Sequence, residues 1–225
     1  VETVPVAPTF SELSEEFQSL WADKTRWQRS EGQTPDEFYG LKAGVMAEFA
    51  KVICVSVGYI YEKNNTSFFR IKSFYGDDEQ LLLNELKTLL DDKFATLSHY
   101  LCAHNGKEFD YPFLCRRMIV NGVTLPKILE IAGKKPWEVR HLDTMELWKF
   151  GDYKHYTSIK LLSALFGIPT PKDDIDGSQV AKVYWQEKDL ERIRVYCQKD
   201  TLTVAQILLK YMGKPILTEE QIEVA

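Results

Sequence analysis

The chain has 225 residues, of which 44% are hydrophobic, and carries a formal net charge of −5. This length and apolar content suffice for one well-packed domain or at most two, and we predict one. The acidic net charge argues against long-range attraction to a polyanion, so any contact with nucleic acid must be local.

The cysteines and the hydropathy pattern indicate where the protein resides. Cys54, Cys102, Cys115 and Cys197 lie in apolar segments and form no Cys-x-x-Cys pair. This pattern argues against a zinc site and against a disulfide framework, and it fits a reducing cytosol. No apolar run approaches the roughly 20 residues that span a bilayer, and no signal peptide is apparent. We therefore predict a soluble, cytoplasmic protein.

The first 50 residues predict a strand followed by a helical insert. Val1-Glu2-Thr3-Val4 has the pattern of the end of a β-strand, whose beginning we expect upstream of Val1. Pro5 and Pro8 end this pattern. The polar, Trp-containing stretch from about 11 to 50 then predicts two or three helices, inserted after the first strand.

The next segments predict a hairpin, a helix and a further strand. Residues 51–61 and 67–75 are rich in β-branched and aromatic residues, and the polar residues 63–65 form a turn between them. Residues 77–92 carry leucines at helical spacing, and 96–103 return to strand character.

The second half of the chain alternates helices with a short strand. We predict helices over 109–120, 158–166 and 190–212, and a short strand over 139–142. Strands in a meander, followed by strands that alternate with helices, are typical of a mixed α/β sheet flanked by helices. The whole of 1–225 is expected to form this single domain.

Asp200 occupies an unusual place for a carboxylate. At 100° per residue it falls near the centre of the apolar face of the last predicted helix. An ionised carboxylate taken out of water must be paired, protonated or bound to a cation. Tyr196 precedes it by one turn and can reach the same neighbourhood. If Asp200 stood alone, the alternative would be a buried aspartate bonded to the backbone or to a basic neighbour.

Two further carboxylates stand where backbone structure does not require them. Glu2 lies at the tip of the first strand and Asp110 at the start of a helix. If they converge with Asp200, they can hold two divalent cations about 3.5–4 Å apart, which activate water for phosphodiester hydrolysis. Carboxylate oxygens suit Mg²⁺ or Mn²⁺. Tyr196 would then orient the attacking water.

Three motifs carry a resemblance to a known family. Asn105-Gly106-Lys107-Glu108-Phe109-Asp110 resembles the second exonuclease motif of the proofreading domains of family B DNA polymerases, and Tyr196-Cys197-Gln198-Lys199-Asp200 resembles the third. Val1-Glu2-Thr3 is similar to the tail of the first motif, Asp-x-Glu-Thr. From Val1 to about Met212 the chain resembles the stand-alone 3′–5′ exonucleases related to that domain, of the DEDDy class.

The resemblance implies a ribonuclease H-like fold, two divalent metal ions and release of nucleoside monophosphates from a 3′ end. It implies that Glu2, Asp110 and Asp200 are metal ligands and that Tyr196 positions the attacking water. The substrate-binding residues that it implies are Thr3, Asn105 and Phe109, with Phe109 stacking on the terminal base. It also places an aspartate immediately before Val1.

Other polar residues have simpler interpretations. Asp143-Thr144-Met145-Glu146 has the pattern of a capping box, and a lone histidine such as His104 at a strand end is more often structural. Five basic residues are candidates for phosphate contacts, although solvated surface is the favoured interpretation. They are Lys107, Arg116, Arg117, Lys154 and Lys160.

We therefore predict a metal-dependent 3′–5′ exonuclease that acts on single-stranded DNA in preference to RNA. Single-stranded nucleic acid is the expected partner, and replication or repair proteins are candidate partners. Two alternatives stay open, a non-catalytic nucleic-acid-binding module of the same fold and a 3′–5′ exoribonuclease. The sequence indicates no oligomeric state.

Overall fold

A mixed sheet forms the centre of the molecule. The computed structural model describes residues 1–96, 98–152, 156–169 and 175–225. The main sheet has the strand order β1-β2-β3-β6, with β1 (Glu2–Pro5), β2 (Ala50–Lys63), β3 (Thr66–Tyr75) and β6 (Ile222–Val224). β2 pairs antiparallel with both β1 and β3, and β6 joins β3 in parallel. The sheet is therefore mixed, as predicted.

A tight turn joins the two long strands. Lys63 pairs with Thr66, so Asn64 and Asn65 alone form the loop. Their φ angles are 51° and 59°, which is the left-handed conformation required by a two-residue hairpin turn with the twist of the strands. Asparagine tolerates this conformation better than most residues. The predicted hairpin is confirmed.

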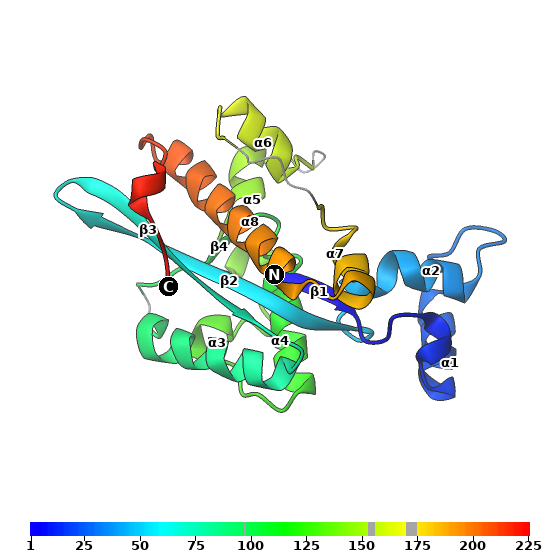
Figure 1. Ribbon diagram of the computed structural model, residues 1–225. Coiled ribbons are helices and arrows are strands. Elements are labelled where there is room, and N and C mark those ends of the chain that lie inside the picture. The colour runs from blue at the N-terminus through cyan, green and yellow to red at the C-terminus, as the bar shows by residue number, and fades with distance from the viewer. Residues whose placement is uncertain (97, 153–155, 170–174) are drawn as a thin grey trace.

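Helices cover both faces of the sheet (Figure 1). α3 (Glu79–Phe94) and α4 (Asp110–Val120) pack on the face that contains Val55 and Phe74. α8 (Leu190–Tyr211) packs on the opposite face, where Cys54 contacts the cluster around Ile193 and Cys197. The adjacent residues Cys54 and Val55 thus face different layers, as the period of two in a strand requires. The fold is an α/β sheet flanked by helices, consistent with a ribonuclease H-like exonuclease.

Two predicted strands are much shorter than expected. The strand predicted over 96–103 is reduced to β4 (Cys102–Ala103), because the His99 N–H bonds to Thr96 O at 3.1 Å and closes a turn there. The strand predicted over 139–142 is replaced by β5 (Leu142–Asp143), since a 3₁₀ turn occupies 136–138. β4 and β5 pair in parallel as a separate two-stranded sheet.

The helical insert has an apolar core of its own. It contains α1 (Glu15–Thr25) and α2 (Pro35–Lys42), flanked by 3₁₀ turns at Phe10–Glu12 and Ala43–Val45. The Trp21 side chain is 0% exposed, and its ring lies 5.2 Å from that of Tyr39. The Tyr39 hydroxyl donates to the carbonyl of Ala7 at 3.1 Å, which ties the insert to the chain after β1. The predicted insert is confirmed.

The other described elements are short. They are 3₁₀ turns at Lys127–Leu129, Pro136–Glu138 and Glu219–Gln221, α5 (Thr144–Lys149), α6 (Ile159–Leu165), α7 (Val180–Lys182) and a π-helical turn at Val183–Glu187. α6 confirms the helix predicted over 158–166, and Ser158 caps it by accepting from the N–H of Leu161. Within the described parts of the chain, no helix is both long and apolar enough to cross a membrane.

Candidate active site

The three predicted carboxylates share one electrostatic neighbourhood. Glu2 opens β1, Asp110 is the first residue of α4, and Asp200 lies in the middle of α8. Glu2 is only 9% exposed. Burial raises the pKa of the Glu2 carboxyl well above its usual value, and the nearby groups Cys197, Asp200 and Asp110 raise it further. Segments far apart in sequence therefore place Asp110 and Asp200 close enough to Glu2 to influence its pKa.

The loop before Asp110 is held in place by one buried carboxylate. Asp143, which is 2% exposed, accepts from the N–H of Asn105 at 2.9 Å and from that of Lys107 at 3.2 Å. It also caps α5 by accepting from the N–H of Met145 at 2.9 Å. The capping role predicted for Asp143 is confirmed. A capping box would also require the Glu146 carboxylate to accept from the N–H of Asp143. This part of the prediction is wrong, because the Glu146 carboxylate instead accepts from Lys107 Nζ at 2.7 Å.

Gly106 permits the close approach of this loop to β4. A Cβ atom at Gly106 would lie 2.3 Å from the Cβ of Ala103 and 3.5 Å from Asp110 Oδ2. The first distance is far inside van der Waals contact, so a side chain here would displace the loop that leads to Asp110. The Asn-Gly pair in the sequence was the available signal for this constraint.

Asn105 combines a left-handed backbone with an open acceptor. Its φ is 62°, and its buried Oδ1 has no hydrogen-bond partner among the described residues. Unsatisfied buried polar atoms and strained residues are both uncommon, and they gather at functional sites. This atom can accept a hydrogen bond from a ligand or water. That Asn105 binds substrate stays a prediction.

The other predicted site residues are placed as follows. Tyr196 lies one turn before Asp200 on α8 and packs, half-buried, against the cluster that contains Val4 and Ile193. Phe109 precedes α4 and lies half-buried, with its ring 5.4 Å from that of Phe113. The Thr3 hydroxyl donates to the carbonyl of Gly44, so it already has a structural partner.

The predicted burial of Asp200 is partly wrong. Its side chain is half-buried rather than enclosed in the core. The reason is that α8 is buried on several sides, at Ile193, Cys197, Thr203, Ala205, Gln206, Ile207 and Leu209, and not along the single stripe that the sequence suggested. Asp200 therefore lies at a partly open position of a largely buried helix.

His104 is structural, as predicted. Its Nδ1 lies 2.9 Å from the Thr144 hydroxyl, and its Nε2 lies 2.8 Å from the Thr157 carbonyl. Burial lowers the pKa of its imidazole. Both ring nitrogens are therefore engaged in connecting β4 to the segments around it.

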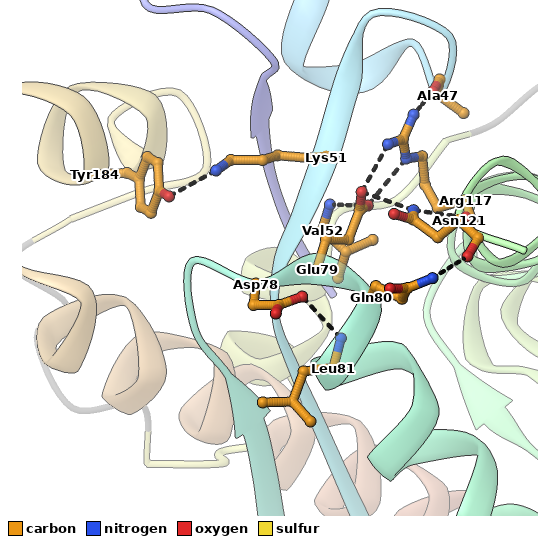
Figure 2. A network of polar contacts seen from close by, with 10 residues as sticks. All are labelled: Ala47, Lys51, Val52, Asp78, Glu79, Gln80, Leu81, Arg117, Asn121 and Tyr184. Atoms are coloured by element: carbon orange, nitrogen blue, oxygen red, sulfur yellow. Dashed lines mark hydrogen bonds and ion pairs between the residues drawn. The ribbon is translucent and has the colours of Figure 1, made fainter. Parts of the chain in front are cut away.

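Two of the basic residues considered for phosphate contacts are already paired with carboxylates of the protein. Arg117 is buried, with Nη2 2.6 Å from the Glu79 carboxylate and Nη1 2.9 Å from the Ala47 carbonyl (Figure 2). Asn121 completes this network by donating to Glu79 at 2.8 Å. Lys107 pairs with Glu146. Arg117 is thus part of the core and cannot contact phosphate.

The remaining basic candidates are not engaged in this way. Arg116 and Lys160 are exposed, and Lys154 lies outside the described residues. Exposure is compatible with both interpretations of Arg116 and Lys160, so solvated surface stays a prediction for them.

The carboxylates suit a divalent metal in their chemistry but are not assembled around one. Among the described residues, no group of three or more His, Cys, Asp or Glu side chains is arranged to hold a metal ion. Glu2, Asp110 and Asp200 nevertheless provide hard oxygen donors, which Mg²⁺ and Mn²⁺ prefer. A cation would also offset the charges of Asp200 and Asp110, which add to the effect of burial in raising the pKa of Glu2. The donor set fits a hard cation.

A comparison with protein families identifies the chain. The model of a family described as predicted 3′–5′ exonuclease related to the exonuclease domain of PolB matches residues 45–222. The match includes Asn105, Asp110, Tyr196 and Asp200, whereas Glu2 lies outside it. Most of the chain is therefore covered. The chain belongs to this family of predicted 3′–5′ exonucleases related to the exonuclease domain of PolB.

Proposed function

We propose that the protein is a metal-dependent 3′–5′ exonuclease of the DEDDy class that acts on single-stranded DNA in preference to RNA. The observation that carries this proposal is the shared electrostatic neighbourhood of Glu2, Asp110 and Asp200, in which burial raises the pKa of Glu2 and the charges of Asp200 and Asp110 raise it further. Family membership supports the reaction type and a nucleic-acid substrate. The single domain, the metals and the preference for DNA are our proposals.

In this proposal Glu2, Asp110 and Asp200 hold two Mg²⁺ or Mn²⁺ ions. When bound, the ions would supply an activated water and would neutralise charge on the scissile phosphate. Tyr196, one turn before Asp200 on the same helix, orients the attacking water through its phenol. Water attacks the terminal phosphodiester, the bond to the 3′ oxygen of the preceding nucleotide breaks, and a nucleoside monophosphate leaves.

The loop 105–109 positions the 3′ end of the substrate. The open Oδ1 of Asn105 accepts a hydrogen bond from the terminal nucleotide, and the half-buried ring of Phe109 stacks on its base. Stacking is tolerant of sequence because every base has a π-face. We therefore expect little base specificity. Thr3 contributes to the same end of the site from β1, next to Glu2.

The test is a degradation assay on the full-length protein titrated with Mn²⁺. Single strands labelled at the 5′ end should shorten one nucleotide at a time, while 3′-labelled strands should release labelled mononucleotide at once. Single-stranded DNA should be degraded faster than RNA of the same sequence. Tight binding without cleavage at any metal concentration would instead support a non-catalytic binding module, and faster RNA cleavage would support an exoribonuclease.

A further inference from the structure

Among the described residues, no helix covers one face of the outer half of the β2–β3 hairpin. Val57 pairs with Lys72, Tyr59 with Arg70, Tyr61 with Phe68 and Lys63 with Thr66. Residues directly opposite in an antiparallel pair share a face, so all of these lie on the face that α3 covers further in. α3 ends at Phe94, and the hairpin projects past it (Figure 1).

The other face of the same hairpin is covered. Phe69 and Ile71 are each 2% exposed and pack with Ala205 and Leu209 of α8 and with Leu217. The hairpin is thus anchored from one side. The side chains on the uncovered face are therefore available for contacts with another molecule.

Aromatic rings run along the uncovered face in an unbroken row. The ring of Tyr59 lies 6.2 Å from that of Phe94 and 5.8 Å from that of Tyr61. The Tyr61 and Phe68 rings are 5.5 Å apart and nearly parallel, at 21°. His99 extends the row beyond Phe94 at 5.3 Å. We call these five residues the aromatic row. Tyr59 is 39% exposed, so the row is accessible at its centre.

Basic side chains border the aromatic row. Lys63, Arg70 and Lys72 are exposed and lie on the same sheet face as Tyr59 by register. Lys72 Nζ lies 4.9 Å from the ring of Phe74, which confirms that it points to this face. Glu223 of β6 is the acidic residue opposite Arg70. Three cations against one carboxylate give these strands a positive face, although the chain as a whole is acidic.

Glu223 also fixes the orientation of the row. Its Oε1 accepts from the Tyr61 hydroxyl at 2.7 Å, and its Oε2 accepts from Arg70 Nε at 2.7 Å. The Arg70 guanidinium lies 5.8 Å from the centre of the Tyr61 ring. The ring and the guanidinium are therefore held before any ligand arrives, which lowers the entropy cost of binding.

We propose that this face is a binding surface for single-stranded nucleic acid, separate from the active site. Bases stack on the aromatic row while Lys63 and Lys72 contact phosphates, as on other sheet faces that bind single strands through aromatic residues. The choice of nucleic acid as the occupant rests on the proposed function, and the charge of the face supports it.

The surface lies well away from the reacting end of the substrate. Glu2 pairs with Cys54, and Tyr61 lies seven residues further along β2. At about 3.3 Å per residue, the separation along the strand is roughly 23 Å. A stacked strand that rises about 3.4 Å per nucleotide, as in B-form DNA, needs about seven nucleotides to span it, and a more extended single strand needs fewer. Long substrates can therefore use the surface, and very short ones cannot.

The experiment measures binding without hydrolysis. Fluorescence anisotropy of a labelled 20-nucleotide oligo(dT), in excess EDTA, should give a Kd at least about fivefold weaker for Tyr59→Leu than for wild type. Tyr59→Phe, which keeps the ring, should bind as wild type does. Trp27→Leu is the matched control, because Trp27 is 88% exposed in the insert. Lys72→Glu should weaken binding and flatten its salt dependence, whereas Lys42→Glu in α2 should not.

The outcomes separate this proposal from the nuclease. The proposal would be overturned if wild type did not bind, or if Tyr59→Leu and Lys72→Glu bound as tightly as wild type. It would also be overturned if Trp27→Leu weakened binding as much as Tyr59→Leu does. Thermal melting of each variant identifies loss of folding, and Lys72→Glu remains decisive if Tyr59→Leu unfolds. If binding depends on Tyr59 but the protein has no nuclease activity, the binding surface is supported and the proposed function is rejected. If both hold, Tyr59→Leu should raise KM for the 20-mer but not for a dinucleotide.

Discussion

Asp143 holds Asn105 in place across 38 residues of sequence, by a hydrogen bond of 2.9 Å from the Asn105 N–H to the Asp143 carboxylate. The same carboxylate accepts from the N–H of Lys107 and caps α5. Because Asp110 follows this loop directly, the position of a proposed metal ligand depends on a residue that belongs to another element. Asp143 is thus a positioning residue of the proposed site.

Replacing Asp143 should therefore cost far more than an ordinary helix cap. In Asp143→Ala the N–H groups of Asn105, Lys107 and Met145 lose their acceptor inside the protein, and we expect about 2–4 kcal/mol of lost stability. Urea unfolding measures this. Asp78→Ala is the matched control, because Asp78 caps α3 with a single bond to the Leu81 N–H, and its loss should cost about 1 kcal/mol. Equal costs for the two variants would show that Asp143 acts only as a cap.

Gly106→Ala should disturb the site through a steric clash. The new methyl group would lie 2.3 Å from the Cβ of Ala103, so either the loop or β4 must move. We expect a loss of about 1–3 kcal/mol in stability and a fall in the activity that depends on Asp110. Gly177→Ala, where nothing lies within 4 Å of the new Cβ, is the control for the glycine change itself. Wild-type stability and activity in Gly106→Ala would mean that this close contact is not required.

Asp143 and Gly106, together with the elements around them, show what the sequence could and could not predict. The hairpin, the insert and the long helices were predictable because their turn residues and hydrophobic periods are local signals. The motif 105–110 could also be found from local sequence. The hydrogen bonds that Asp143 accepts from Asn105 and Lys107 could not be predicted, since they depend on which loop lies next to β5 in the fold. The lengths of β4 and β5 were overestimated, because β-propensity does not show how many residues of a segment pair with a neighbouring strand.

The buried ion pair of Arg117 and Glu79 gives a further prediction. Arg117→Leu leaves the Glu79 carboxylate buried without its main partner, and breaking such a pair costs about 3–5 kcal/mol. Arg116→Leu, one residue earlier at an exposed position, should change the free energy of unfolding by no more than about 0.5 kcal/mol. Chemical denaturation of both variants checks the difference. A small cost for Arg117→Leu would mean that Asn121 and the Val52 N–H suffice to satisfy Glu79.

His141 should make stability depend on pH on the acid side of neutrality. Its Nδ1 accepts from the N–H of Leu101 at 3.2 Å and its Nε2 donates to the Ile128 carbonyl at 2.9 Å, so the folded state holds the neutral ring. Burial lowers its pKa below the ordinary 6.5. The unfolded chain therefore binds a proton that the folded chain does not, and the free energy of unfolding falls as pH drops below about 6.5.

The check is the free energy of unfolding measured from pH 8 to pH 5 for wild type and His141→Asn. The variant should be less stable at neutral pH but should lose less stability as the pH falls. Some decline will remain in the variant, because burial also lowers the pKa of His104. Parallel profiles for the two proteins would contradict the role assigned to His141.

The central claim is that the carboxylates around Glu2 form a metal-dependent nuclease site, and Asp200→Asn tests it most directly. The measurement is the rate of Mn²⁺-stimulated release of nucleoside monophosphate from the 3′ end of single-stranded DNA, made on the full-length protein. Asp92→Asn, at an exposed position of α3, is the matched control. Asp200→Asn should reduce the rate at least about 100-fold while Asp92→Asn leaves it unchanged, because loss of a metal ligand removes charge stabilisation worth several kcal/mol. Undiminished release by folded Asp200→Asn would contradict the account.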